Sequence, residues 1–163
     1  MPVSILVTMP TTLTIMAGVL VRAAPQQVWD TGTDWSRQHE WIWATRVTGG
    51  CGAGAAVSGW TGIGPVGFTD TMVITEWDPP RRCTVTHTGR VVRGSGVFEV
   101  RPRGDRSEFR WIERIELPLP PALGRLAGAV IGPIARLGLG SSLRRFARLF
   151  PVGDAGPGPG SRP

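Results

Sequence analysis

A series of short alternating segments separated by turn residues constrains the fold of this chain most strongly. Apolar and polar residues alternate within each segment, which is the two-residue period of a strand with one buried face. The segments are 68–77, 83–88, 91–100 and 107–117. Their connections, such as Asp78-Pro79-Pro80, have the length of hairpin turns, so consecutive strands must pair antiparallel. The sequence therefore predicts an antiparallel meander.

The residues before this meander predict one strand, two short helices and a glycine-rich segment with a turn. β-branched residues over 11–22 indicate the first strand, and Pro25 then favours the start of a helix that ends near Gly32. Asp34 is a suitable cap for a second short helix. The glycine-rich stretch 48–67 contains a turn at Gly62, Gly64 and Pro65, which lies between two probable strands.

A long helix is predicted over 122–150, after the prolines at 118, 120 and 121. Its apolar residues recur at three- and four-residue spacing, and we expect this stripe to face the sheet. The stripe consists of Leu123, Leu126, Val130, Ile134 and Leu137. Gly128, Gly132 and Pro133 should kink or weaken the middle of the helix.

This order of elements predicts an α+β fold in which a curved antiparallel sheet wraps around the long C-terminal helix. A sheet that bends around one helix tends to leave a gap at its centre, where a small molecule can bind. We expect one domain over 11–150, a poorly ordered leader over 1–10, and a disordered Gly/Pro-rich tail over 151–163.

The charged residues narrow the possible functions. All 18 basic residues are arginines, and the formal net charge is +6. Lysine, tyrosine and asparagine are absent, which excludes Schiff-base lysines, tyrosine acids and asparagine oxyanion donors. Because the arginines are scattered among acidic and apolar residues, we expect a solvated surface and no nucleic-acid partner.

Other sequence features argue against a zinc site, a disulfide, a phosphate-binding loop and a membrane-inserted segment. Cys51 and Cys83 share no ligand spacing, so we expect neither zinc nor a disulfide, and a cytoplasmic location. His39 has no second ligand at metal-binding spacing, and the glycine run 49–54 lacks the Gly-Lys-Ser/Thr of a phosphate loop. Residues 2–21 are uncharged, but threonines and a proline favour a strand over stable membrane insertion.

Several segments in this order resemble the START-like, or polyketide cyclase/dehydrase, superfamily, also called SRPBCC or the helix-grip fold. The segments that carry the resemblance are AAPQQVWD at 23–30, Asp34-Trp35 to Glu40-Trp41, EWDPPRR at 76–82, His87-Thr88-Gly89, GSGVF at 94–98 and Trp111-Ile112-Glu113. The resemblance implies a cavity for lipids, polyketides or other apolar molecules, and no obligatory cofactor. It does not imply catalysis, because members differ in activity.

Strand alternation selects His87 and Glu113 as the polar side chains expected to point into an apolar pocket. His87 shares a face with Cys83 and Val85, and Glu113 shares one with Phe109 and Trp111. The two could act as a general acid/base pair on a polyketide carbonyl. Alternatively, His87 is a hydrogen-bonded core residue, and Glu113 pairs with Arg90 or Arg93.

Apolar and aromatic side chains are further candidates for ligand contacts. These candidates are Trp41, Trp60, Val85, Phe109, Trp111, Val130 and Ile134. The tryptophans could stack on an aromatic ligand at the pocket mouth, but plain packing is the alternative.

Three functions are compatible with this pattern. The first is binding or carrying of an apolar molecule, such as a lipid or polyketide, between sheet and helix. The second is a polyketide aromatase/cyclase or dehydratase that uses His87 and Glu113. The third is a partner-binding module whose basic helix end, at Arg144, Arg145 and Arg148, docks on an acidic protein or membrane surface. The sequence indicates no oligomeric state.

Overall fold

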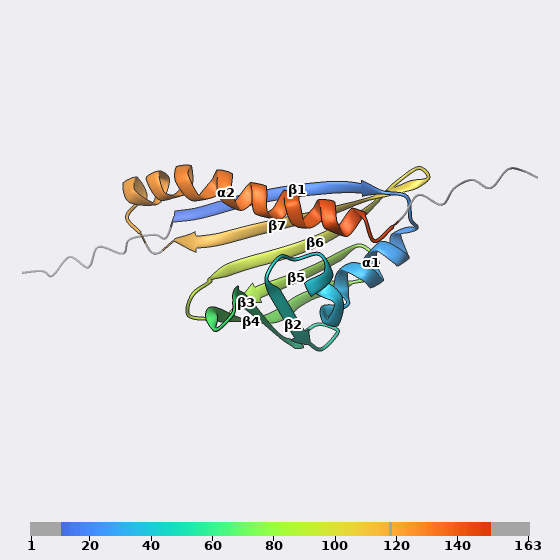
Figure 1. Cartoon of the computed structure of the whole chain (residues 1–163), viewed down its shortest axis with the longest axis horizontal. Coiled ribbons are helices and arrows are strands. Elements are labelled where there is room, and N and C mark those ends of the chain that lie inside the picture. The colour runs from blue at the N-terminus through green and yellow to red at the C-terminus, as the bar shows by residue number, and fades with distance from the viewer. Residues whose placement is uncertain (1–10, 118, 151–163) are drawn as a thin grey trace, which may run out of the picture.

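The structure is a computed structural model that describes residues 11–117 and 119–150. It contains one seven-stranded antiparallel sheet in the order β1-β7-β6-β5-β4-β3-β2 (Figure 1). The strands are β1 Thr11–Val21, β2 Thr45–Gly49, β3 Ala56–Ile63, β4 Val66–Asp78, β5 Arg82–His87, β6 Gly94–Arg103 and β7 Arg106–Leu117. The leader at 1–10 and the tail at 151–163 lie outside the described residues.

Three helices accompany the sheet: α1 (Pro25–Thr33), the 3₁₀ helix η1 (Trp35–Glu40) and α2 (Pro121–Ala147). Pro25 occupies the first turn of α1, where the missing N–H costs nothing. The Asp34 side chain accepts a hydrogen bond from the Ser36 backbone N–H at 3.1 Å and so caps η1. The α+β class, the two short helices and the long C-terminal helix are confirmed.

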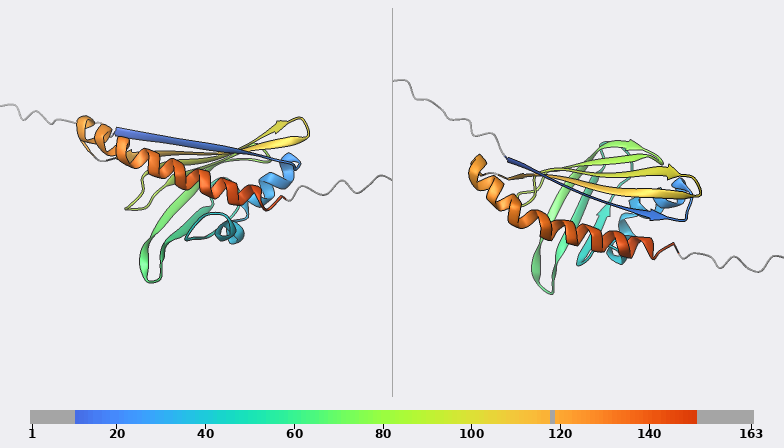
Figure 2. Two further views of the ribbon diagram at one scale, coloured as in Figure 1. Left: turned by 45° about the horizontal axis from the view of Figure 1, so that its top comes forward. Right: turned by 90° about the horizontal axis from the view of Figure 1, so that it is seen from above.

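The sheet is strongly curved. β1 pairs with β7 along its whole length, whereas β2, β3 and β4 turn steeply away from this pair (Figure 2). The register between β4 and β5 shifts between Ile74 and Glu76, which is a β-bulge that increases local bending. The resulting concave face carries both the hydrophobic core and the cavity.

An aromatic cluster fills one end of the concave face. Trp41, which follows η1, lies with its ring 5.0 Å from the Phe146 ring of α2 in an edge-on arrangement. Phe109 of β7 stacks on Phe146 with ring centroids 4.3 Å apart, and the ring of Phe98 of β6 lies 5.3 Å from that of Phe109. Since all four rings meet here, the cluster joins the sheet to the C-terminal turns of α2 and to the end of η1.

The orientation predicted for the first half of the long helix is wrong. Its apolar stripe is exposed, with Val130 60% and Ile134 67% accessible to solvent. The side of α2 that faces β1 instead carries Gly124, Gly128 and Gly132, and a β-carbon at Gly124 would overlap the Thr11 side chain. Small residues allow the backbones of helix and strand to approach closely. α2 is also uninterrupted through Pro133, so it does not break at its centre.

Candidate ligand-binding site

A partly enclosed cavity of about 180 Å³ lies on the concave face of the sheet. Strands β2 to β7 form its floor, and Trp35 and Gln38 of η1 cover it together with Ile42, two residues after η1. Its lining residues are Trp35, Gln38, Ile42, Thr45, Val47, Val57, Gly59, Thr61, Asp70, Met72, Cys83, Val85, His87, Gly96, Phe98, Trp111 and Glu113. No lining residue belongs to α2 in the described chain, so the expected position of the cavity, between the sheet and the long helix, is wrong.

Three ionisable side chains meet at one end of the cavity, and we call them the polar cluster: Asp70, His87 and Glu113. His87 Nδ1 lies 2.7 Å from Asp70 Oδ2, and His87 Nε2 lies 3.2 Å from Glu113 Oε2. The Trp111 indole N–H donates to the other oxygen of Glu113 at 2.5 Å. All three side chains of the polar cluster are largely buried, at 7 to 14% exposure.

The polar cluster determines the charge of His87. Burial alone would lower the pKa of the imidazole, but the hydrogen bonds and charges of Asp70 and Glu113 outweigh it and raise this pKa to about 9. His87 is therefore an imidazolium at neutral pH and donates both ring N–H groups to carboxylates. Glu113 pairs with His87, and the predicted pairing with Arg90 or Arg93 is wrong.

A glycine makes room for the Glu113 carboxylate. Gly96 of β6 lies opposite Glu113 in the β6–β7 register, and a β-carbon there would lie 3.0 Å from Glu113 Oε1. It would also lie 3.2 Å from Val85 Cγ2. Both distances are tighter than ordinary contact, so a larger residue would displace Glu113 or close part of the cavity.

Other polar groups on this fold are neutralised differently. Glu99, which is also buried, accepts hydrogen bonds from the guanidinium groups of Arg82, Arg101 and Arg110. Burial raises the pKa of the Cys83 thiol in the cavity wall to about 12, so this cysteine stays a neutral thiol rather than a nucleophile. Among the described residues that line this cavity, the carboxyl groups are those of Asp70 and Glu113, both in the polar cluster.

The polar cluster does not have the arrangement of a metal site. Asp70 and Glu113 bind opposite nitrogens of one imidazole ring, so the three side chains do not converge on a common point. No group of three possible metal ligands is found among residues 11–117 and 119–150.

The candidate residues from sequence fall into four groups. Val85 and Trp111 line the cavity together with His87 and Glu113. Trp41 and Phe109 are fully buried in the aromatic cluster, and Trp60 lies on the opposite face of β3 from the lining residues Gly59 and Thr61. Val130 and Ile134 are exposed and do not line the cavity, because α2 packs through its glycines.

Asp70 and Gln38 are lining residues that sequence reasoning did not identify. Asp70 shares its face of β4 with Met72 and Ile74, so the alternation that identified His87 could also have identified Asp70. Its pairing with His87 depends on the β4–β5 register, in which Met72 lies opposite His87. Gln38 is 3% exposed and lies in a 3₁₀ helix too short to show a periodic pattern.

The curved sheet, the two short helices and the C-terminal helix define the helix-grip fold of START-like proteins. The model of the family described as polyketide cyclase / dehydrase and lipid transport matches residues 12–150. The chain belongs to this family, which is associated with binding or processing hydrophobic small molecules. The resemblance stated from sequence is therefore confirmed.

Solved structures share this fold at low sequence identity. TTHA0849 from Thermus thermophilus is 14% identical with a TM-score of 0.67, and the match covers 83% of this chain and 94% of that one. CV1439 from Chromobacterium violaceum is 17% identical with a TM-score of 0.63, covering 85% and 96%. DynU16, a protein in the dynemicin biosynthetic locus, is 16% identical with a TM-score of 0.64, covering 86% and 48%. No curated protein matches the chain.

Proposed function

We propose that this protein binds an apolar small molecule, with a ring-sized group in the cavity and a hydroxyl or similar donor at the polar cluster. The observation that carries the proposal is a cavity whose walls are mainly apolar and whose ionisable groups gather at one end. Family membership supports a hydrophobic ligand.

The cavity volume limits what can be enclosed. A cavity of about 150 Å³ is known to hold a benzene molecule, and this one measures about 180 Å³. A single ring, or a hydrocarbon group of that size, fills it. The rest of a larger lipid or polyketide would extend through the open side.

The polar cluster favours a ligand that donates a hydrogen bond. His87 uses both of its ring N–H groups on Asp70 and Glu113, so the polar cluster offers a ligand acceptor oxygens and no free imidazole N–H. Asp70 Oδ1 is buried and accepts no hydrogen bond within the described part of the chain. Buried acceptors are normally satisfied, and a ligand hydroxyl would supply the missing donor.

Extraction of the purified protein tests this proposal. Protein isolated from its host and denatured in organic solvent should release an apolar molecule that mass spectrometry identifies. Val85→Trp should abolish this release by filling the cavity. Val91→Trp is the matched control, because Val91 is 65% exposed and lies outside the cavity lining. An empty wild-type protein that shows no thermal shift with a panel of lipids and aromatic compounds would contradict the proposal.

Acid/base catalysis is a second candidate, favoured by the contact between His87 and Glu113. In a dehydration, the bound substrate would replace the contact between His87 Nε2 and Glu113 Oε2. The Glu113 carboxylate would then take a proton from the carbon next to a carbonyl, and the His87 Nε2–H would protonate the leaving hydroxyl. The products would be an alkene and water. Proton transfer from Glu113 to His87 through Oε2 and Nε2 would then restore both groups.

The ligand found by extraction also tests the catalytic candidate. If the protein cyclises or dehydrates that ligand or its hydroxylated precursor, the double change His87→Ala and Glu113→Gln should abolish turnover. Binding with no turnover by the wild-type protein, or turnover that survives the double change, would eliminate this candidate. The binding proposal would stand in either case.

A further inference from the structure

The side of α2 that points away from the sheet is apolar. Leu123, Leu126, Val130, Ile134 and Leu137 are 55 to 71% exposed, whereas Gly124 and Gly132 on the other side are buried. These five side chains, which we call the outer stripe, extend over about 21 Å of helix at 1.5 Å per residue. Monomeric soluble proteins rarely expose a continuous apolar surface of this size, so the outer stripe is expected to contact something.

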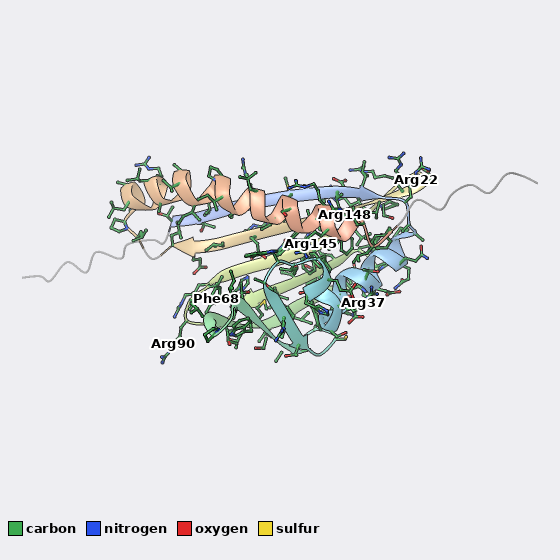
Figure 3. All side chains as sticks on the ribbon, in the orientation of Figure 1. Arg22, Arg37, Phe68, Arg90, Arg145 and Arg148 are labelled. Carbon is green, nitrogen blue, oxygen red and sulfur yellow. The ribbon has the colours of Figure 1, made fainter. Side chains whose placement is uncertain are left out.

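The charges next to the outer stripe are all positive. Residues 121–150 contain five arginines and no aspartate or glutamate. Arg144 and Arg148 follow the outer stripe on the same side of the helix and are exposed. Figure 3 shows Arg145 and Arg148 at the C-terminal end of α2.

We infer that the outer stripe and its arginines dock on the surface of an anionic lipid membrane. Apolar side chains would enter the interface between headgroups and acyl chains, and the arginines would contact phosphate groups. The glycine side of α2 would stay packed on β1, so the helix would lie along the surface (Figure 2). α2 is long and apolar enough to cross a membrane by length and composition, but Arg136 near its middle and the packing on β1 favour the surface.

A second copy of this chain is a poorer partner for the same surface. Two outer stripes paired in parallel would bring Arg144 against Arg144, and an antiparallel pair would bring Arg125 near Arg136. Neither helix offers an acidic residue to neutralise these contacts. An anionic lipid surface supplies that charge.

Co-sedimentation with vesicles tests the inference with the full chain. The protein should bind vesicles of phosphatidylcholine mixed with phosphatidylglycerol more tightly than vesicles of phosphatidylcholine alone, and added salt should weaken this binding. The double variant Leu126→Gln and Ile134→Gln should lose it. Arg144→Gln with Arg148→Gln should reduce it about 25-fold, at about fivefold per arginine.

Matched variants control for general changes in surface character. Ile63 and Val91 are as exposed as Ile134 and Leu126, so Ile63→Gln with Val91→Gln should leave binding unchanged. Arg22→Gln with Arg90→Gln removes two exposed arginines elsewhere and should have little effect (Figure 3). All substituted residues are exposed, so the variants should melt at wild-type temperatures.

Three results would overturn the inference. One is no binding of the wild-type protein to anionic vesicles. Another is binding that persists in the Leu126→Gln and Ile134→Gln variant. The third is a wild-type dimer in sedimentation equilibrium that this variant converts to monomer, which would assign the outer stripe to a second copy.

Discussion

The imidazole of His87 lies between two carboxylates, so its protonation sets the charge at the polar end of the cavity. The folded-state pKa of about 9 exceeds the ordinary value of 6.5, because Asp70 and Glu113 bind the charged ring. The protonated form therefore stabilises the fold. This contribution is complete below pH about 6.5 and is lost as the pH rises through about 9.

The free energy of unfolding should accordingly fall between pH 6.5 and 9. The loss is on the order of 3 kcal/mol for a shift of this size. Urea denaturation at several pH values measures it. Glu113→Gln should flatten this part of the profile, because the variant loses one of the charges that raise the pKa of His87.

An NMR titration of the two histidines tests the same point directly. The His87 ring should stay protonated through neutral pH in the wild-type protein, and its pKa should fall in Glu113→Gln. His39 is exposed on η1 and serves as the reference signal, which this variant should leave unchanged. A His87 pKa near 6.5 in the wild-type protein would contradict the proposed charge state.

At the scale of elements, α2 illustrates what the sequence could and could not predict. The strands and short helices follow from alternation, Pro25 and the Asp34 cap, because these features act locally. The orientation of α2 does not follow from periodicity. An apolar stripe identifies a side that avoids water, but Gly124 and Gly132 give the opposite side a closer fit to β1. How closely α2 fits β1 depends on the side chains of β1, which the periodicity of α2 does not report.

Two glycine substitutions in α2 should have opposite effects. Gly124→Ala should destabilise the protein by about 1–3 kcal/mol, because the added methyl group would overlap the Thr11 side chain. Gly138→Ala meets no atom within 4 Å and should stabilise the helix by about 0.5–1 kcal/mol. Thermal unfolding of the two variants checks this contrast. Equal effects would mean that α2 does not pack on β1 through its glycines.

At the scale of the whole molecule, the aromatic cluster ties α2 to the sheet at one end of the concave face, while the cavity lies beside it. Phe146→Ala should destabilise the protein by about 3–5 kcal/mol, because it empties a fully buried site. Leu137→Ala, at a residue that is 71% exposed, should change stability by less than about 0.5 kcal/mol. Urea denaturation compares the two, and a large loss from Leu137→Ala would contradict the exposed position of the outer stripe.

The site, like the orientation of α2, was only partly predictable, because some of its contacts join residues that are far apart in the sequence. Alternation along β5 and β7 placed His87 and Glu113 on one face, because that property belongs to single strands. The pairing of His87 with Asp70 depends on the register between β4 and β5. The burial of Trp41 depends on its packing against Phe146 of α2. These contacts join segments far apart in the chain.

The most direct test of the central claim is an NMR titration with p-cresol, a ring-sized probe that carries one hydroxyl, alongside toluene. We predict that the methyl signals of Met72 and Val85 shift saturably, and that p-cresol binds more tightly than toluene by its hydrogen bond to the polar cluster. Asp70→Asn should reduce this difference, because it replaces the carboxyl group whose Oδ1 lacks a hydrogen-bond donor, and Val85→Trp should abolish both responses. Shifts confined to the outer stripe, or no saturable shift, would show that the cavity does not hold an apolar ligand.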